Sequence, residues 1–192
     1  MTEAAPVQRV LNYWFGPLGS AEDGQIRALW FQKSAATDAE ITQRFSGLIA
    51  DALAGRLPAW GDSPLARLAR ILLLDQFTRN VYRDSPQAFV GDDLALQLSL
   101  SLLDSGALEP LQRWFALLPL EHAEDLALQQ RSVQQFEALA ASDARMAGAL
   151  DYARRHLDVI ARFGRFPHRN SVLGRASTDP ELTYLAQPGA GF

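Results

Sequence analysis

The hydrophobic positions between residues 64 and 83 recur with the spacing of an α-helix, and partway along the same face polar residues replace them. Ser63 followed by Pro64 is a helix-start signal, because the hydroxyl can cap a free backbone N–H and proline at the first helical position costs no hydrogen bond. The face begins with Leu65, Leu68, Ala69 and Leu72 and continues with Asp75, Gln76, Arg79, Asn80 and Arg83. Polar side chains that extend a core stripe predict either a salt-bridged helix end at the rim of the core or the lining of a cavity.

Start and stop signals predict further helices along the chain. Thr37 and Glu40 form a capping box, and Pro119 is expected to end a short helix. The predicted helices cover residues 6–15, 37–54, 92–105, 110–118, 120–141 and 143–163, and a last short helix opens at the Thr178–Glu181 capping box. No stretch shows the alternation typical of a β-strand. The sequence therefore predicts an all-α protein of seven to nine helices, in a single domain that spans residues 1–192.

Two more segments carry polar residues where a core face is expected. On the predicted helix 120–141, a polar start made of His122, Asp125 and Gln129 leads into an apolar face. The loop after residue 164 carries four such residues: Arg165, His168, Arg169 and Asn170. His156 lies on the apolar face of helix 143–163, where a single histidine is more typical of a hydrogen-bonded core residue than of a ligand.

Composition narrows the classes of function. The net charge of −4 argues against a duplex nucleic acid partner, which usually requires a broad basic surface. The chain has no cysteine, so disulfides, thiolate catalysis and cysteine metal sites are excluded. The N-terminal residues lack the apolar segment of a secretory signal, and the longest apolar run, residues 114–120, is too short to span a membrane. We expect a cytoplasmic protein with no membrane association.

No established catalytic motif occurs: the chain has no glycine-rich phosphate loop, GxSxG elbow, HExxH or dinucleotide fingerprint. The spacing of the three histidines matches no known ligand motif, so neither a metal site nor a cofactor is predicted. Arginine suits carboxylate and phosphate groups, because its two parallel N–H donors match two oxygens. The predicted ligand-binding residues are Asp75, Gln76, Arg79, Asn80, Arg83, His122, Asp125, Gln129, His156, Arg165, His168, Arg169 and Asn170.

Three hypotheses follow from this set of residues. The first is a buried pocket lined by arginine, histidine and aspartate that binds a small anionic metabolite. The second is a hydrolase that uses a histidine–carboxylate pair in the same pocket, with catalytic residues unassigned. The third is a helical scaffold for a protein partner, in which the polar clusters are ion pairs that only stabilise the fold. The sequence does not define the oligomeric state.

Five segments resemble a bacterial family catalogued as domain of unknown function 924, which is described as tetratricopeptide-like. They are VLNYWFG (10–16), WFQKSAATDAEI (30–41), LLLDQFTRNVYRDSPQAF (72–89), LPLEHAEDLALQQRSVQQFE (118–137) and RFGRFPHRNSVLGRASTDPEL (162–182). The resemblance implies a compact tetratricopeptide-like helical superhelix. It implies no established activity and no catalytic residues, so no role is carried over.

Overall fold

The computed structural model describes residues 5–103 and 106–191, and within them the secondary structure is helical, with no strand. The α-helices are α1 (Pro6–Phe15), α2 (Ala35–Leu53), α3 (Pro64–Ile71), α4 (Thr78–Val81), α5 (Asp92–Leu100), α6 (Pro110–Glu121), α7 (Leu126–Ser142), α8 (Ala147–Phe163) and α9 (Asp179–Leu185). A π-helical segment, Leu72–Phe77, joins α3 to α4. The predicted all-α class is confirmed, and the tetratricopeptide-like superhelix stays a prediction.

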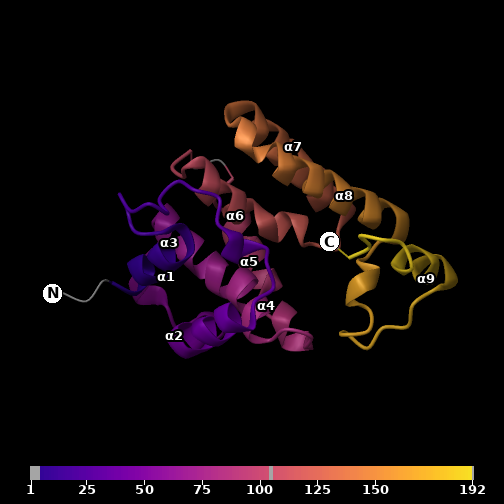
Figure 1. Ribbon diagram of the computed structural model, residues 1–192, viewed down its shortest axis with the longest axis horizontal. Helices are drawn as coiled ribbons and strands as arrows, with labels where there is room; N and C mark the ends of the chain where they lie inside the picture. Colours follow the sequence, from indigo (N-terminus) through magenta and orange to yellow (C-terminus); the bar gives the residue numbers. More distant parts are fainter. Residues whose placement is uncertain (1–4, 104–105, 192) are drawn as a thin grey trace.

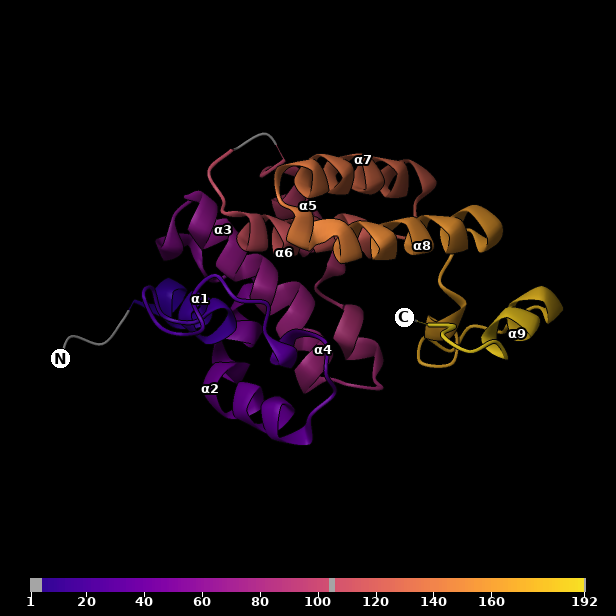
Figure 2. The ribbon, with the colours of Figure 1, turned by 45° about the horizontal axis from the view of Figure 1, so that its top comes forward.

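The helices pack in two groups that share α6. Helices α7 and α8 run antiparallel along one side, and α1 to α5 gather on the other (Figures 1 and 2). The π-helical segment passes through the centre of the second group, and all six of its side chains are buried. Aromatic rings connect α1, the π-helical segment and α6: the Trp14 ring centroid lies 5.3 Å from that of Phe77 and 5.4 Å from that of Phe115. This core fixes the path of the segment that carries Asp75.

Local capping signals agree with several predicted helix ends. The Ser63 hydroxyl accepts a hydrogen bond from the Ala66 amide, and Thr178 forms its predicted capping box with Glu181. Gly164 ends α8 in the left-handed conformation, with a φ of 69°. The predicted start of α2 was wrong, because Ser34 is the cap and the helix opens at residue 35.

Pro119 does not end a helix, which corrects the prediction of separate helices over 110–118 and 120–141. Helix α6 continues through Pro119 to Glu121, and α7 opens only after its cap, Asp125. The residues around Pro119 are buried, so packing outweighs the hydrogen bond that proline cannot donate. His122 therefore lies at the end of α6 and shares no helical face with Gln129.

The helix predicted to run unbroken to residue 83 widens into π geometry at Leu72–Phe77 and ends at Val81. Two side chains bond carbonyl groups of this segment: Thr78 Oγ1 donates to Leu74 O at 2.8 Å, and Arg79 Nη1 donates to Asp75 O at 2.5 Å. π-Helical turns are frequent at functional sites.

Two other predicted bounds differ from the structure. Helix α5 ends at Leu100, and the last two residues of the predicted 92–105 helix lie outside the described residues. Helix α8 begins at Ala147, after a short 3₁₀ turn over 144–146, instead of at 143.

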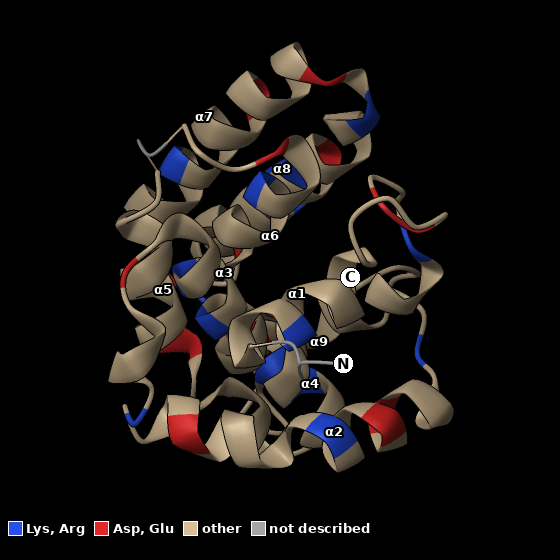
Figure 3. Ribbon diagram, turned by 90° about the vertical axis from the view of Figure 1, so that its left-hand side faces the viewer, with Lys and Arg blue, Asp and Glu red and all other residues tan. Residues whose placement is uncertain are grey.

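Charge is distributed without a large region of one sign in the view of Figure 3, where α2 carries both acidic and basic positions. Within 5–103 and 106–191, no helix combines the length and the apolar character that a membrane span requires.

Candidate functional site

Asp75 lies at the centre of a buried polar cluster. Its side chain is completely buried, and Oδ1 lies 2.7 Å from His122 Nδ1 and 3.1 Å from Arg79 Nη1. Oδ2 accepts a hydrogen bond of 2.6 Å from Gln76 Nε2. Three of the predicted residues therefore surround a fourth, as expected for a buried carboxylate that must be paired and hydrogen-bonded.

Asp92, in the first turn of α5, connects this cluster to the C-terminal part of the chain. Arg79 Nη2 donates to Asp92 Oδ2 at 3.1 Å. After α8 the chain turns back beneath that helix (Figure 2), and Arg169 Nη1 reaches His122 O at 3.1 Å. The same nitrogen lies 3.7 Å from Asp92 Oδ2, a looser ion pair. The Arg169 guanidinium also covers the Phe166 ring, 4.5 Å from its centroid.

Burial and charge set the protonation of the central pair. Burial opposes ionisation of Asp75, but the charge of Arg79 and the interaction with His122 outweigh it and hold the pKa of Asp75 below its usual value. Burial lowers the pKa of His122, although the Asp75 carboxylate opposes that shift. His122 is therefore neutral at pH 7, with the Nδ1 hydrogen donated to Asp75, and Nε2 is left as an acceptor.

A second buried pair lies behind the first. Glu121 Oε1 is 3.2 Å from His156 Nδ1, and that nitrogen also donates to Tyr152 O at 2.8 Å. Burial raises the pKa of Glu121 to about 8, with a smaller contribution from Asp75, and lowers that of His156 to about 3. Both side chains are uncharged at neutral pH. Among the described residues, Glu121 Oε2 has no hydrogen-bond partner.

An open cavity of about 300 Å³ lies beside His122 and Arg169. It is lined by Asp92, Asp93, Leu96, Pro119, His122, Ala123, Glu124, Asp125, Leu128 and Arg169. The His122 side chain is 15% exposed, so a small molecule in the cavity can reach its ring. Burial lowers the pKa of Arg169 to about 10, which leaves the guanidinium charged at neutral pH.

The model of the family described as "Bacterial protein of unknown function (DUF924)" matches residues 10–189. The chain belongs to this family. A solved structure titled "Structure of Protein of Unknown Function ATU0120 from Agrobacterium tumefaciens" is 37% identical and superposes with a TM-score of 0.75, over 82% of this chain and 88% of that one. No curated protein matches the chain.

Two residues predicted to bind a ligand, Asp125 and Gln129, bond backbone groups at helix ends in this family member. Asp125 is exposed, lines the rim of the cavity and accepts a hydrogen bond of 2.9 Å from the Leu128 amide at the start of α7. Gln129 is buried, and its Nε2 donates to Glu121 O at 2.6 Å and to Ala123 O at 2.8 Å. These carbonyls lie at the end of α6, where the helix itself supplies no donors.

Four other predicted residues bind carboxylates away from the central cluster. Arg83 forms a two-point ion pair with Asp38, which also accepts from Asn80 Nδ2 at 2.8 Å. Arg165 forms a similar pair with Glu181 at 2.6 and 2.8 Å, and Asn170 Nδ2 lies 3.4 Å from the same carboxylate. Arg83 and Arg165 thus form ion pairs of the kind that the third hypothesis predicts, and Asn80 and Asn170 donate hydrogen bonds to the same two carboxylates.

His168 does not line the cavity. Its ring lies 5.6 Å from that of Phe166, and burial lowers its pKa to about 4. Asp92 was not among the residues predicted from the sequence, because an acidic residue in a first helical turn is an ordinary feature. The sequence did hold one indication of its role: Asp92 comes three residues after the segment 72–89, which carries Asp75 and Arg79. Within the described ranges, no group of three or more histidine and acidic residues is arranged to hold a metal ion.

Proposed function

We propose that this protein binds a small molecule bearing a carboxylate or phosphate group in the cavity beside His122, with Arg169 holding the anionic group. The observation that carries the proposal is that His122 is held by two contacts. Buried Asp75 binds its ring at 2.7 Å, and Arg169 Nη1 donates to the backbone carbonyl of His122 at 3.1 Å. An imidazole and a guanidinium are thereby held at one wall of one cavity.

Charge pairing favours Arg169 over Arg79 as the anion-binding group. Arg79 is paired with two carboxylates, Asp75 and Asp92, each at 3.1 Å. Arg169 has only the 3.7 Å pair with Asp92, and among the described residues its Nη2 makes no hydrogen bond. A guanidinium that is mostly buried and incompletely paired binds an oxyanion strongly, because little water competes.

The rim of the cavity restricts the other end of the ligand. Asp93 and Asp125 are exposed there, and Glu124 is already paired with Arg175 at 2.6 Å. Negative side chains at the rim favour a ligand whose distal end is cationic or donates hydrogen bonds. The geometry supports a compact molecule such as an amino carboxylate over a polyanion.

Thermal unfolding in the presence of small carboxylates and phosphates, with and without an amino group, tests this proposal. Ligand binding to the folded state alone at 100 times Kd should stabilise it by about 3 kcal/mol. Arg169→Gln should abolish the shift in Tm, whereas Arg154→Gln should retain it, because Arg154 forms only an exposed ion pair on α8. If no compound shifts the Tm, or if folded Arg169→Gln responds like the wild type, the proposal is wrong.

A second candidate function is hydrolysis, with His122 as a general base. The specific observation is the buried aspartate on Nδ1, the arrangement that orients a catalytic histidine and stabilises its charged form. No serine or threonine is among the residues that line the cavity, so the nucleophile would be water. His122 Nε2 would take a proton from water as its oxygen attacks a carbonyl or phosphoryl centre, and Arg169 would stabilise the developing negative charge. The resulting imidazolium would then give that proton to the departing alcohol or amine as its bond to the centre breaks, which restores neutral His122.

Generic ester, amide and phosphate-ester substrates test this candidate. His122→Ala should lower kcat by about 100-fold or more, as expected for the loss of a general base. The activity should also fall as the pH drops, because protonated His122 cannot accept a proton. If wild type and His122→Ala turn over every substrate at the same rate, hydrolysis of these substrate classes is excluded.

A further inference from the structure

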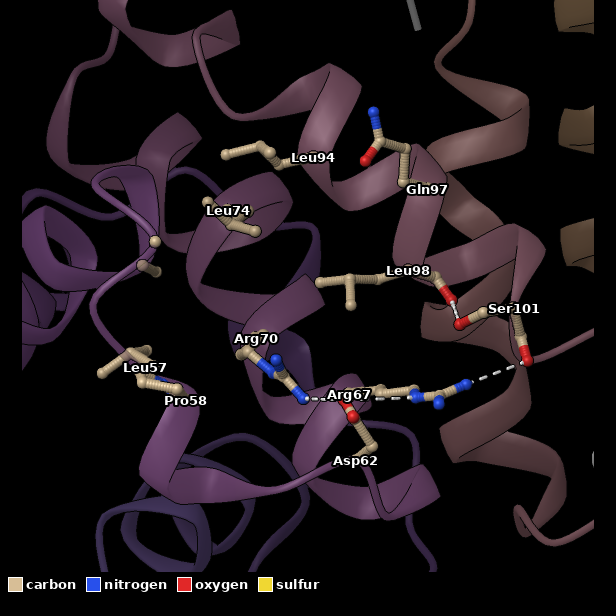
Figure 4. Close-up of a pocket in the computed structure, with 12 residues that line it drawn as sticks. Leu57, Pro58, Asp62, Arg67, Arg70, Leu74, Leu94, Gln97, Leu98 and Ser101 are labelled. Atoms are coloured by element: carbon tan, nitrogen blue, oxygen red, sulfur yellow. Dashed lines mark hydrogen bonds and ion pairs between the residues drawn. The ribbon is translucent and has the colours of Figure 1, made fainter.

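A separate cavity of about 440 Å³ lies on the other side of the π-helical segment. Leu74 contributes to its wall, while the neighbouring Asp75 belongs to the polar cluster. The lining comes from the end of α2, residues 55–62, α3 and α5 (Figure 4). The volume lies within the range of cavities that bind small ligands.

Most of the cavity wall is apolar. Leu57, Leu74, Leu94 and Leu98 face the space, with Pro58 beside Leu57 (Figure 4). Leu94 is 38% exposed, so part of its side chain is open to a ligand in this cavity. An alkyl chain placed among these side chains would remove exposed apolar surface from water, which favours binding.

The charged groups meet at one end of this cavity, where Figure 4 shows Arg67, Arg70 and Asp62 together. Arg70 Nη2 lies 3.1 Å from Asp62 Oδ1 and also donates to Gly61 O, while Arg67 Nε lies 3.9 Å from the same carboxylate. Two guanidiniums thus share one carboxylate. Among the described residues, Arg70 Nη1 and Arg67 Nη2 make no hydrogen bond.

The exposure of these three side chains shows which of them is the weak partner. Arg70 and Arg67 are only 17% and 28% exposed, whereas Asp62 is 77% exposed. An exposed carboxylate contributes little to an ion pair, so a ligand can take its place or bind beside it. The surplus of one positive charge matches a monoanion, and a fork of N–H donors matches two carboxylate oxygens.

We propose that this cavity binds a medium-chain carboxylic acid, with its alkyl chain among the leucines and its carboxylate on Arg67 and Arg70. The site is independent of the cavity beside His122. A carboxylate is favoured over a phosphate monoester, because the latter carries more negative charge than the single surplus positive charge at this end of the cavity.

Titration calorimetry with decanoate, below the concentration at which it forms micelles, tests the assignment on the full chain. Decanol, which lacks the charge, and acetate, which lacks the chain, should both bind more weakly than decanoate. Arg67→Gln should weaken decanoate binding by about tenfold through the loss of a charge-assisted contact. Leu94→Glu should weaken it at least as much, and its exposed position makes the substitution compatible with folding.

Asp62→Asn should strengthen decanoate binding, which is not expected if Arg67, Arg70 and Asp62 only stabilise the fold. Removing the competing carboxylate should tighten decanoate binding by about threefold. Arg154→Gln on α8 should leave decanoate affinity unchanged, because Arg154 forms only an exposed ion pair and does not line this cavity. The inference is wrong if the wild type does not bind decanoate, if decanol binds as tightly, if folded Leu94→Glu binds equally, or if Asp62→Asn binds no more tightly.

Discussion

Replacing Glu121 by glutamine should stabilise the protein, and the gain should grow with pH. Glu121 is 4% exposed and its pKa is raised to about 8, chiefly by burial. Glutamine has nearly the same shape as the protonated acid and never ionises. The change therefore removes the free energy that wild type spends in keeping this buried group protonated.

The magnitude follows from the two pKa values of the carboxyl group. In the unfolded chain a glutamate loses its proton near pH 4, while the folded state keeps it until about pH 8. The unfolded state binds fewer protons in this window, so wild-type stability should fall as the pH rises through it. At about 1.4 kcal/mol for each pKa unit, the accumulated penalty at pH 7 is about 4 kcal/mol.

Urea denaturation of wild type and Glu121→Gln at intervals from pH 5 to pH 9 measures this penalty. The difference in the free energy of unfolding should be about 1 kcal/mol at pH 5, rise toward about 4 kcal/mol at pH 7 and level off above pH 8. Both proteins retain His156, whose own titration largely cancels in the difference. The buried-acid interpretation would fail if the difference did not vary with pH.

Glu137→Gln is the matched control, because Glu137 is 49% exposed and forms a surface ion pair with Arg154. Its effect on the free energy of unfolding should stay within about 0.5 kcal/mol at every pH. A comparable pH-dependent gain in this control would show that net charge, and not burial of Glu121, produces the effect.

Three further predictions concern residues that hold the polar cluster and its neighbouring helices in place. Gly91→Ala should destabilise the protein by about 2 kcal/mol, measured by urea denaturation, because its Cβ would lie 2.3 Å from Leu74 O; Gly148→Ala, with open space at that position, should not. Asp125→Ala should cost about 1 kcal/mol as a lost helix cap while leaving ligand-induced shifts in Tm intact, and loss of those shifts would return Asp125 to the binding site. Asp75→Asn should cost about 3 kcal/mol at pH 7. Because the pKa of Asp75 is lowered in the folded state, its contribution to the free energy of unfolding should be lost as the pH falls below about 4. The prediction is contradicted if the stability of Asp75→Asn falls with acid as steeply as that of wild type.

The segment around the site was only partly predictable. The switch from apolar to polar residues marked Asp75, Gln76 and Arg79, and the structure places all three in the central cluster. The same pattern also selected Asn80 and Arg83, which bind Asp38 from another helix. Helical periodicity shows which side chains share a face, but it does not show which of two nearby carboxylates they reach.

Sequence alone determined the all-helical class, the cap at Ser63, the capping box at Thr178 and the end of α8 at Gly164, because each depends on hydrogen bonds within a few residues. The tertiary structure decided the rest. It carried α6 through Pro119 and so moved His122 to a helix end beside Asp75. Such contacts join residues far apart in the chain, and their free energy comes from burial that no local pattern encodes.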